Sequence, residues 1–130
     1  MKEVGLFFSL ILLLTACPMD RERGLVVKNN SNQVIVVTGG YILPDTLLPK
    51  NLNKLININP NDKHSIYGGL VGDSWWEKLD RGEKLTLFVL SKDSIDKYSW
   101  DYLRENNVII KRYEFNWEEL DMIKWHITYP

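Results

Sequence analysis

Hydrophobic and polar residues alternate in short runs over most of the chain, from residue 24 to residue 130. Such runs, interrupted by Asn, Gly, Pro and Asp, are typical of β-strands joined by turns. The tetrad Asn-Asn-Ser-Asn at 29–32 favours a turn, so we expect the two strands that flank it to form a β-hairpin. The pattern predicts strands at 25–28, 33–38, 55–58, 64–67, 84–90, 108–115 and 125–129.

Two of these strands carry further information about which faces are buried. In the strand 84–90 apolar residues occupy both faces, with Leu87 on one and Phe88 on the other, which predicts a central strand covered on both sides. The strand 125–129 alternates strictly instead. We expect one face of it to hold Trp125, Ile127 and Tyr129, and the other to hold His126 and Thr128.

Helical spacing is concentrated in the second half of the chain. Apolar residues recur at helical intervals over 93–106, which predicts one amphipathic helix or two short helices hinged at Ser99. Asn116 followed by Glu119 has the form of a capping box and predicts the start of another short helix. A parallel α/β sheet would need a helix after most strands. The sequence therefore predicts a mainly β fold, an antiparallel β-sandwich of about seven strands with short helical insertions in the second half.

The amino terminus has a different pattern, an almost uninterrupted apolar run over residues 5–16. A helix needs about twenty residues to cross a bilayer, so this run is too short to span a membrane comfortably. It fits the apolar region of a secretory signal peptide. The alternative is a buried core helix, but nothing polar divides the run into an amphipathic face.

The run ends in a motif that resembles the lipobox of bacterial lipoproteins, formed here by Leu14, Thr15, Ala16 and Cys17. The resemblance implies a diacylglycerol on the Cys17 sulfur, cleavage before Cys17, and acylation of the new amino terminus with a fatty acid such as palmitate. A thiolate is the nucleophile that this chemistry needs, and two or three acyl chains anchor a protein stably. We therefore expect a signal peptide at 1–16, a lipidated tether at 17–23 and one β-sandwich-like domain at 24–130.

The residues after the lipobox bear on location. In many Gram-negative bacteria an Asp directly after the cysteine retains a lipoprotein at the inner membrane, and Pro18 stands at that position here. The resemblance therefore implies a lipid anchor in the outer membrane. Asp20 and Glu22 are a weak version of the acidic tether found on surface-exported lipoproteins of Bacteroides-like bacteria, so the periplasmic and cell-surface faces both stay open.

Composition narrows the classes of function. Sixteen basic and seventeen acidic residues give a net charge of -1, and no basic block of the kind that binds a phosphate backbone is present, so nucleic acid is not an expected partner. The single cysteine excludes an intrachain disulfide and a Cys/His metal cluster. We expect neither a metal nor a cofactor.

The body of the chain resembles small uncharacterised lipoproteins of Bacteroides-like bacteria. The resemblance implies a secreted, lipidated domain of unknown function and supplies no catalytic residue. It rests on short segments, namely Pro44-Asp45-Thr46, Ser99-Trp100-Asp101, Lys111-Arg112-Tyr113 and 125–130, Trp-His-Ile-Thr-Tyr-Pro.

Aromatic residues offer the best candidate for ligand binding. The chain has five tryptophans and six tyrosines, and sugar rings stack on such side chains. Trp117 and Trp125 follow helix and strand periodicity and are expected to be core residues. Trp75 and Trp76 are adjacent in a loop and cannot easily both point inward, so we expect at least one ring to be exposed and available to a ligand or a membrane surface, with Asp73 as a further ligand contact.

Three functions remain in order of preference. The first is a lipid-anchored, non-enzymatic binding or accessory module, with a glycan as one ligand, and the second is a structural component that binds another envelope protein. The third is a hydrolase, in which His64 or His126 would serve a serine nucleophile. Paired acids at 118–119 could suggest glycoside chemistry, but acids in a first helical turn more often stabilise the helix dipole. No catalytic residue is assigned.

Overall fold

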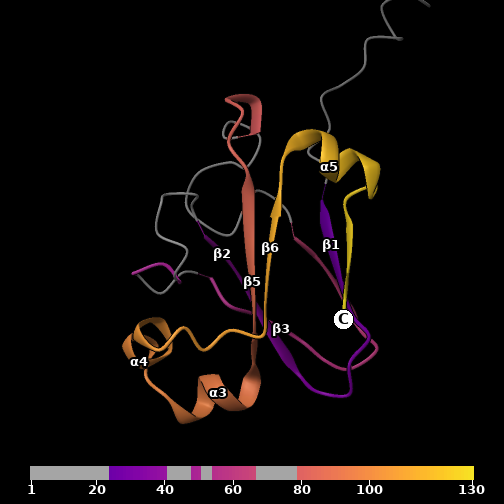
Figure 1. Ribbon diagram of the computed structural model, residues 1–130. Coiled ribbons are helices and arrows are strands. Elements are labelled where there is room, and N and C mark those ends of the chain that lie inside the picture. The colour runs from indigo at the N-terminus through magenta and orange to yellow at the C-terminus, as the bar shows by residue number, and fades with distance from the viewer. Residues whose placement is uncertain (1–23, 41–47, 51–53, 67–78) are drawn as a thin grey trace, which may run out of the picture.

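Seven strands form two sheets in the computed structural model, which describes residues 24–40, 48–50, 54–66 and 79–130 (Figure 1). One sheet has the order β4-β1-β7 and the other has the order β3-β2-β5-β6. Among the described strands every pairing is antiparallel except β1 with β7, which is parallel. The mainly β sandwich is confirmed. The strands are β1 Leu25–Asn29, β2 Ile35–Gly40, β3 Ile56–Ile58, β4 Lys63–Ile66, β5 Leu85–Ser91, β6 Lys111–Phe115 and β7 His126–Tyr129.

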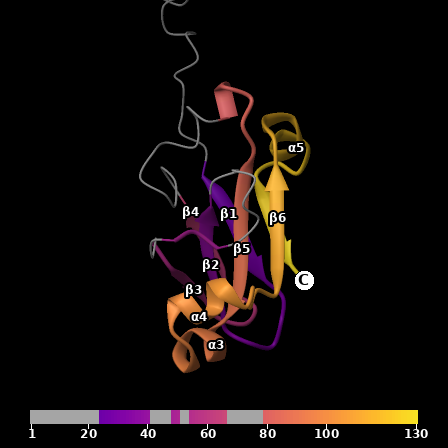
Figure 2. The same cartoon turned by 60° about the vertical axis from the view of Figure 1, so that its left-hand side comes forward.

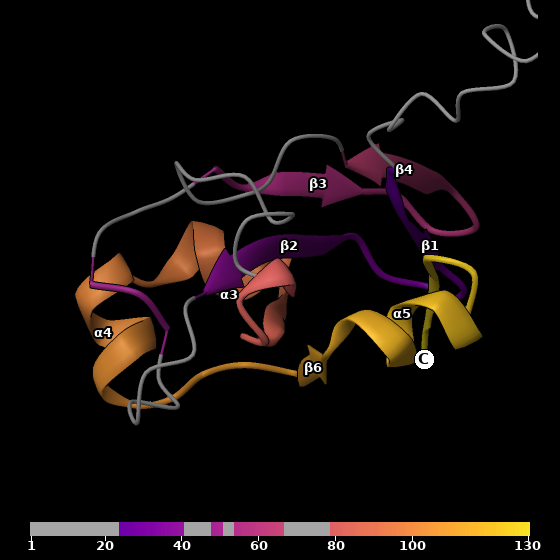
Figure 3. The same ribbon diagram turned by 90° about the horizontal axis from the view of Figure 1, so that it is seen from above.

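Three short helices follow β5, as the periodicity predicts: α3 Lys92–Lys97, α4 Trp100–Glu105 and α5 Trp117–Met122. Ser99 separates α3 from α4 and caps α4, so the expected hinge is confirmed. Asn116 and Glu119 form both hydrogen bonds of the capping box at the start of α5, each at 2.8 Å. The pair α3–α4 lies at one end of the sandwich and α5 at the other (Figures 1 and 3).

The core has two parts because β5 is buried on both faces. Between the sheets, Leu87 and Val89 pack with Val27, Ile127 and Trp125. On the other face, Phe88 and Leu90 pack with residues of the α3–α4 region, which Figure 2 shows at the foot of this sheet. The central, doubly covered strand expected from the sequence is confirmed.

The expected hairpin of the first two strands is wrong, because β1 and β2 belong to different sheets. The cause is Asn29, whose side chain is fully buried where the chain crosses between the layers. Its amide donates to the carbonyl oxygens of Gln33 and Ile58, and its carbonyl oxygen accepts from the backbone N–H and hydroxyl of Ser31. The bonds to Ser31 and Gln33 satisfy polar groups within the turn, and the bond to Ile58 joins β1 to β3 across the sandwich. The turn is therefore stable without hydrogen bonds between β1 and β2.

No helix in the described part of the chain is long and apolar enough to cross a bilayer.

Candidate functional site

The residues expected to carry the lipid and the ligand lie outside the described ranges, namely Cys17, Asp73, Trp75 and Trp76. The expected signal peptide and tether at 1–23 and the segment Pro44-Asp45-Thr46 also lie outside them. The two tryptophans assigned to packing are both found in the core region. Trp125 is 4% exposed, and half-buried Trp117 meets it edge to face at 5.6 Å between ring centroids. The packing role expected for this pair is confirmed.

The two histidines flank β1 but lie on different faces of its sheet. His64 on β4 is paired with Val27, whose side chain belongs to the core, whereas His126 on β7 is paired with Val26. Ser65 shares the outer face with His126, but β1 lies between them, so their backbones are about 10 Å apart. His126 is therefore too far from Ser65 for a hydrogen bond between their side chains, and His64 lies on the opposite face of the sheet.

The outer face of the β4-β1-β7 sheet, turned away from the core, presents a small array of polar side chains. One row across the three strands is Lys63, Lys28 and Thr128. The neighbouring row is Ser65, Val26 and His126, and Val26 is its half-buried apolar centre. Residues in such rows are cross-strand neighbours, with Cβ atoms about 5 Å apart.

Two lysines are neighbours in this array. Lys28 and Lys63 are directly opposite each other on antiparallel strands, and both side chains are exposed. In the part of the chain that the structure describes, neither forms an ion pair. Like charges directly opposite each other destabilise a sheet. A ligand that carries negative charge would relieve this repulsion.

The array borders a hollow of about 430 Å³, which we call the basic groove. It opens on the outer face of the sheet and reaches the turn between β3 and β4. Its lining includes Val26, Lys28, Asn61, Asp62, Lys63, His126 and Thr128.

The turn that closes the groove is held by Asn29. The backbone of Asn29 donates to Asp62 at 2.9 Å and accepts from Asn61 at 2.7 Å. Asn61 has a left-handed backbone with φ 61°, which asparagine tolerates better than most residues. One carboxylate oxygen of Asp62 accepts the N–H of Lys63 at 2.9 Å. This bond fixes the Asp62 carboxylate in the turn, and Asp62 lines the same groove as the two lysines.

His126 is oriented by its own backbone surroundings. Its Nδ1 lies 2.6 Å from the carbonyl oxygen of Lys124. A carbonyl oxygen only accepts, so Nδ1 carries the hydrogen and donates, and Nε2 is the acceptor in the neutral ring. The groove thus holds an imidazole that can accept a hydrogen bond, or donate one when it is protonated.

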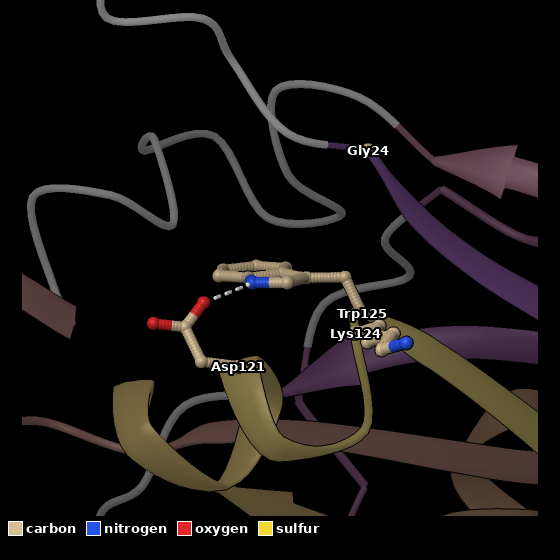
Figure 4. Close-up of a pocket in the computed structure, with 4 residues that line it drawn as sticks. All are labelled: Gly24, Asp121, Lys124 and Trp125. Atoms are coloured by element: carbon tan, nitrogen blue, oxygen red, sulfur yellow. Dashed lines mark hydrogen bonds between the residues drawn. The ribbon is translucent and has the colours of Figure 1, made fainter.

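A second hollow, of about 420 Å³, is formed by Gly24, Asp121, Lys124 and Trp125 (Figure 4). The indole Nε1 of Trp125 donates to a carboxylate oxygen of Asp121 at 2.9 Å, as the dashed line in Figure 4 shows. These two polar groups already satisfy each other. The basic groove, whose lysines form no ion pair with another described residue, is the stronger candidate.

No local sequence pattern indicates the pair of Lys28 and Lys63. The residues lie thirty-five positions apart, and only the register of β1 with β4 makes them neighbours. Each lysine stands in a polar position of an edge or solvent-facing strand, where lysine is ordinary. The two lysines could be recognised as neighbours only if the pairing of β1 with β4 were known. The expected hairpin paired β1 with β2 instead.

Comparisons with family models, curated proteins and solved structures give no match for this chain. Among the described residues, no group of three His, Cys, Asp or Glu side chains gathers in a way that could hold a metal ion.

Proposed function

We propose that this chain is a lipid-anchored lipoprotein of the outer membrane whose folded domain is a non-enzymatic binding module for anionic ligands. The lipobox ending at Cys17 supports the anchor. The basic groove supports the binding role, and the single observation that carries it is the cross-strand pair of Lys28 and Lys63 without an ion-pair partner among the described residues.

The electrostatics of the groove favour an anion with several contacts. Two ammonium groups held on neighbouring strands can both contact one negatively charged group, and Thr128 adds a hydroxyl in the same row. Because the lysines are exposed, their attraction for a ligand is screened by salt. Binding should therefore weaken as ionic strength rises.

The test compares dextran sulfate with uncharged dextran as probes for the full-length chain purified in detergent. The double variant Lys28→Gln, Lys63→Gln should bind dextran sulfate at least about tenfold more weakly than the unchanged chain, since each lost contact to a charged group costs about 1.5 kcal/mol or more. Lys54→Gln with Lys84→Gln makes the same change in net charge at exposed positions away from the groove. Equal losses in both double variants would contradict a site at the groove.

A further inference from the structure

The basic groove combines groups that a simple anion does not need. Besides the two lysines it is lined by Asp62, Asn61 and Thr128, whose side chains carry a carboxylate, an amide and a hydroxyl. A carboxylate only accepts hydrogen bonds, so its natural partner on a ligand is a donor such as a hydroxyl group. It would repel a ligand that carries negative charge alone.

The groove also has one apolar residue among its polar ones. Val26 is half-buried between the polar rows and lines the groove. The strands lie about 4.8 Å apart and alternate residues on one strand about 6.8 Å apart, so the array measures about 10 Å by 7 Å. This is the size of one or two sugar rings, whose C–H faces are apolar and whose rims carry hydroxyl groups.

We infer that the basic groove binds an acidic saccharide, with a negatively charged substituent on Lys28 and Lys63, ring hydroxyls on Asp62 and Asn61, and a ring face over Val26. The inference rests on the proposed function and names the ligand class of the same site. A saccharide that carries both a carboxylate and hydroxyl groups satisfies the cations and the carboxylate together, whereas phosphate or sulfate satisfies only the cations.

The experiment is calorimetric titration of the full-length chain in detergent with a tetramer of galacturonic acid. The methyl-esterified tetramer is the matched control, because it keeps the hydroxyl groups and loses the charge. Inorganic sulfate and glycerol phosphate test a simple anion and the headgroup chemistry of an anionic lipid. We expect the acidic tetramer to bind at least about tenfold more tightly than the other three, a difference of about 1.4 kcal/mol.

The variant Asp62→Asn separates the two kinds of ligand by the sign of its effect. Asparagine keeps the oxygen that accepts the N–H of Lys63 and removes the negative charge. For a saccharide bound through its hydroxyls we expect severalfold weaker binding, because hydrogen bonds to a charged acceptor are the stronger ones. For a simple anion the same change should strengthen binding.

The possible failures are distinguishable. If sulfate or glycerol phosphate binds in a lysine-dependent way and the acidic tetramer does not, the saccharide inference is overturned and the anion-binding function stands. If the esterified tetramer binds as well as the acid, the charge does not select the ligand and the inference is also overturned. If neither the tetramer nor dextran sulfate binds, both proposals are overturned.

Discussion

The backbone N–H of Trp125 donates to the carbonyl oxygen of Leu120 at 2.9 Å, across five residues at the end of α5. Together with the bond from Lys124 N–H to the Asp121 carbonyl at 3.1 Å, it forms a Schellman motif. The motif requires a left-handed residue after the cap, and Lys124 occupies that position with φ 54°. Glycine is the usual residue there, so α5 ends in a strained backbone, and Trp125, which follows with φ 58°, joins this turn to β7 at His126.

Replacing Lys124 by glycine should stabilise the fold. A non-glycine residue in the left-handed region costs about 1–2 kcal/mol, and the added freedom of glycine in the unfolded chain offsets part of this. We expect Lys124→Gly to raise the free energy of unfolding by about 0.5–1 kcal/mol, measured as an upward shift of the urea midpoint at unchanged slope.

The end of α4 provides the matched control for this variant. Asn107 holds the same position with φ 51°, in a motif closed by the bond from Val108 N–H to the Leu103 carbonyl at 2.9 Å. Asparagine tolerates the left-handed region better than lysine. Asn107→Gly should therefore gain less than Lys124→Gly, and a loss of stability in Lys124→Gly would contradict the strain at this turn.

Asn29 should be the most sensitive polar residue of the sandwich. Its side chain is fully buried and makes four hydrogen bonds, three within the 29–33 turn and one to the carbonyl of Ile58 on the other sheet. Asn29→Ala leaves the buried carbonyl of Ile58 without this donor, at a cost of about 1–3 kcal/mol, and removes three partly buried hydrogen bonds of the turn, each contributing about 1 kcal/mol. We expect a total loss of roughly 3 kcal/mol in urea unfolding. The exposed Asn32, changed to Ala, should lose less than about 0.5 kcal/mol. Similar losses in the two variants would argue against the bridging role.

Asn29 also explains why sequence analysis placed the strands well but paired the first two wrongly. Periodicity is a local property, so it located β5, the two helices hinged at Ser99 and the alternating faces of β7. An Asn-rich turn, however, can close a hairpin or cross between two sheets. The choice depends on the partner of the Asn29 amide, the carbonyl of Ile58, which lies twenty-nine residues away. Such a contact leaves no local pattern.

The difference between local periodicity and long-range pairing also limits what the sequence predicts about the basic groove. Alternation correctly placed His126 and Thr128 on the polar face of the last strand. It could not bring them beside Lys28 and Lys63, because the parallel pairing of β1 with β7 joins segments about a hundred residues apart. The candidate site is therefore formed by the pairing of strands that are distant in the sequence, and not by a local sequence motif.

Two buried threonines should tolerate the loss of their hydroxyl groups. Within the part of the chain that the structure describes, the Oγ1 atoms of Thr38 and Thr86 are buried without a hydrogen-bond partner. Valine has nearly the same shape and removes the cost of a buried, unpaired hydroxyl, which is about 1–3 kcal/mol. We expect Thr38→Val and Thr86→Val each to raise the thermal midpoint, with exposed Thr128→Val close to unchanged. Lower midpoints in both buried variants would show that these hydroxyls bond to ordered water.

Tyr113 should make the fold sensitive to alkali. Burial, and to a lesser extent the neighbouring Tyr129, raise the pKa of Tyr113 above its ordinary value of 10.0. The folded state therefore holds the phenolic proton at a pH where the unfolded chain has released it. The stability contributed by this proton is complete below pH 10.0 and is lost as the pH rises through the folded pKa.

The measurement is the urea midpoint from neutral pH to about pH 11. Tyr113→Phe should reduce the alkaline fall in stability, since the group that titrates is gone. Tyr102→Phe, at a residue 43% exposed, should leave the fall unchanged. An identical alkaline fall in the unchanged chain and in Tyr113→Phe would show that other groups govern this pH range.

Lipid attachment at Cys17 gives the most direct prediction about location. The proposed anchor requires the sulfur of Cys17, and serine cannot form the thioether. In a bacterium that expresses the full-length chain, the unchanged protein should incorporate labelled palmitate and sediment with membranes, because its acyl chains together bind a bilayer stably. Cys17→Ser should incorporate no palmitate and accumulate as an uncleaved precursor, visible as a band larger by the sixteen residues of the expected signal peptide. A Cys17→Ser chain that is cleaved normally and released in soluble form would instead indicate an ordinary secretory signal, and the groove would then belong to a secreted protein without an anchor.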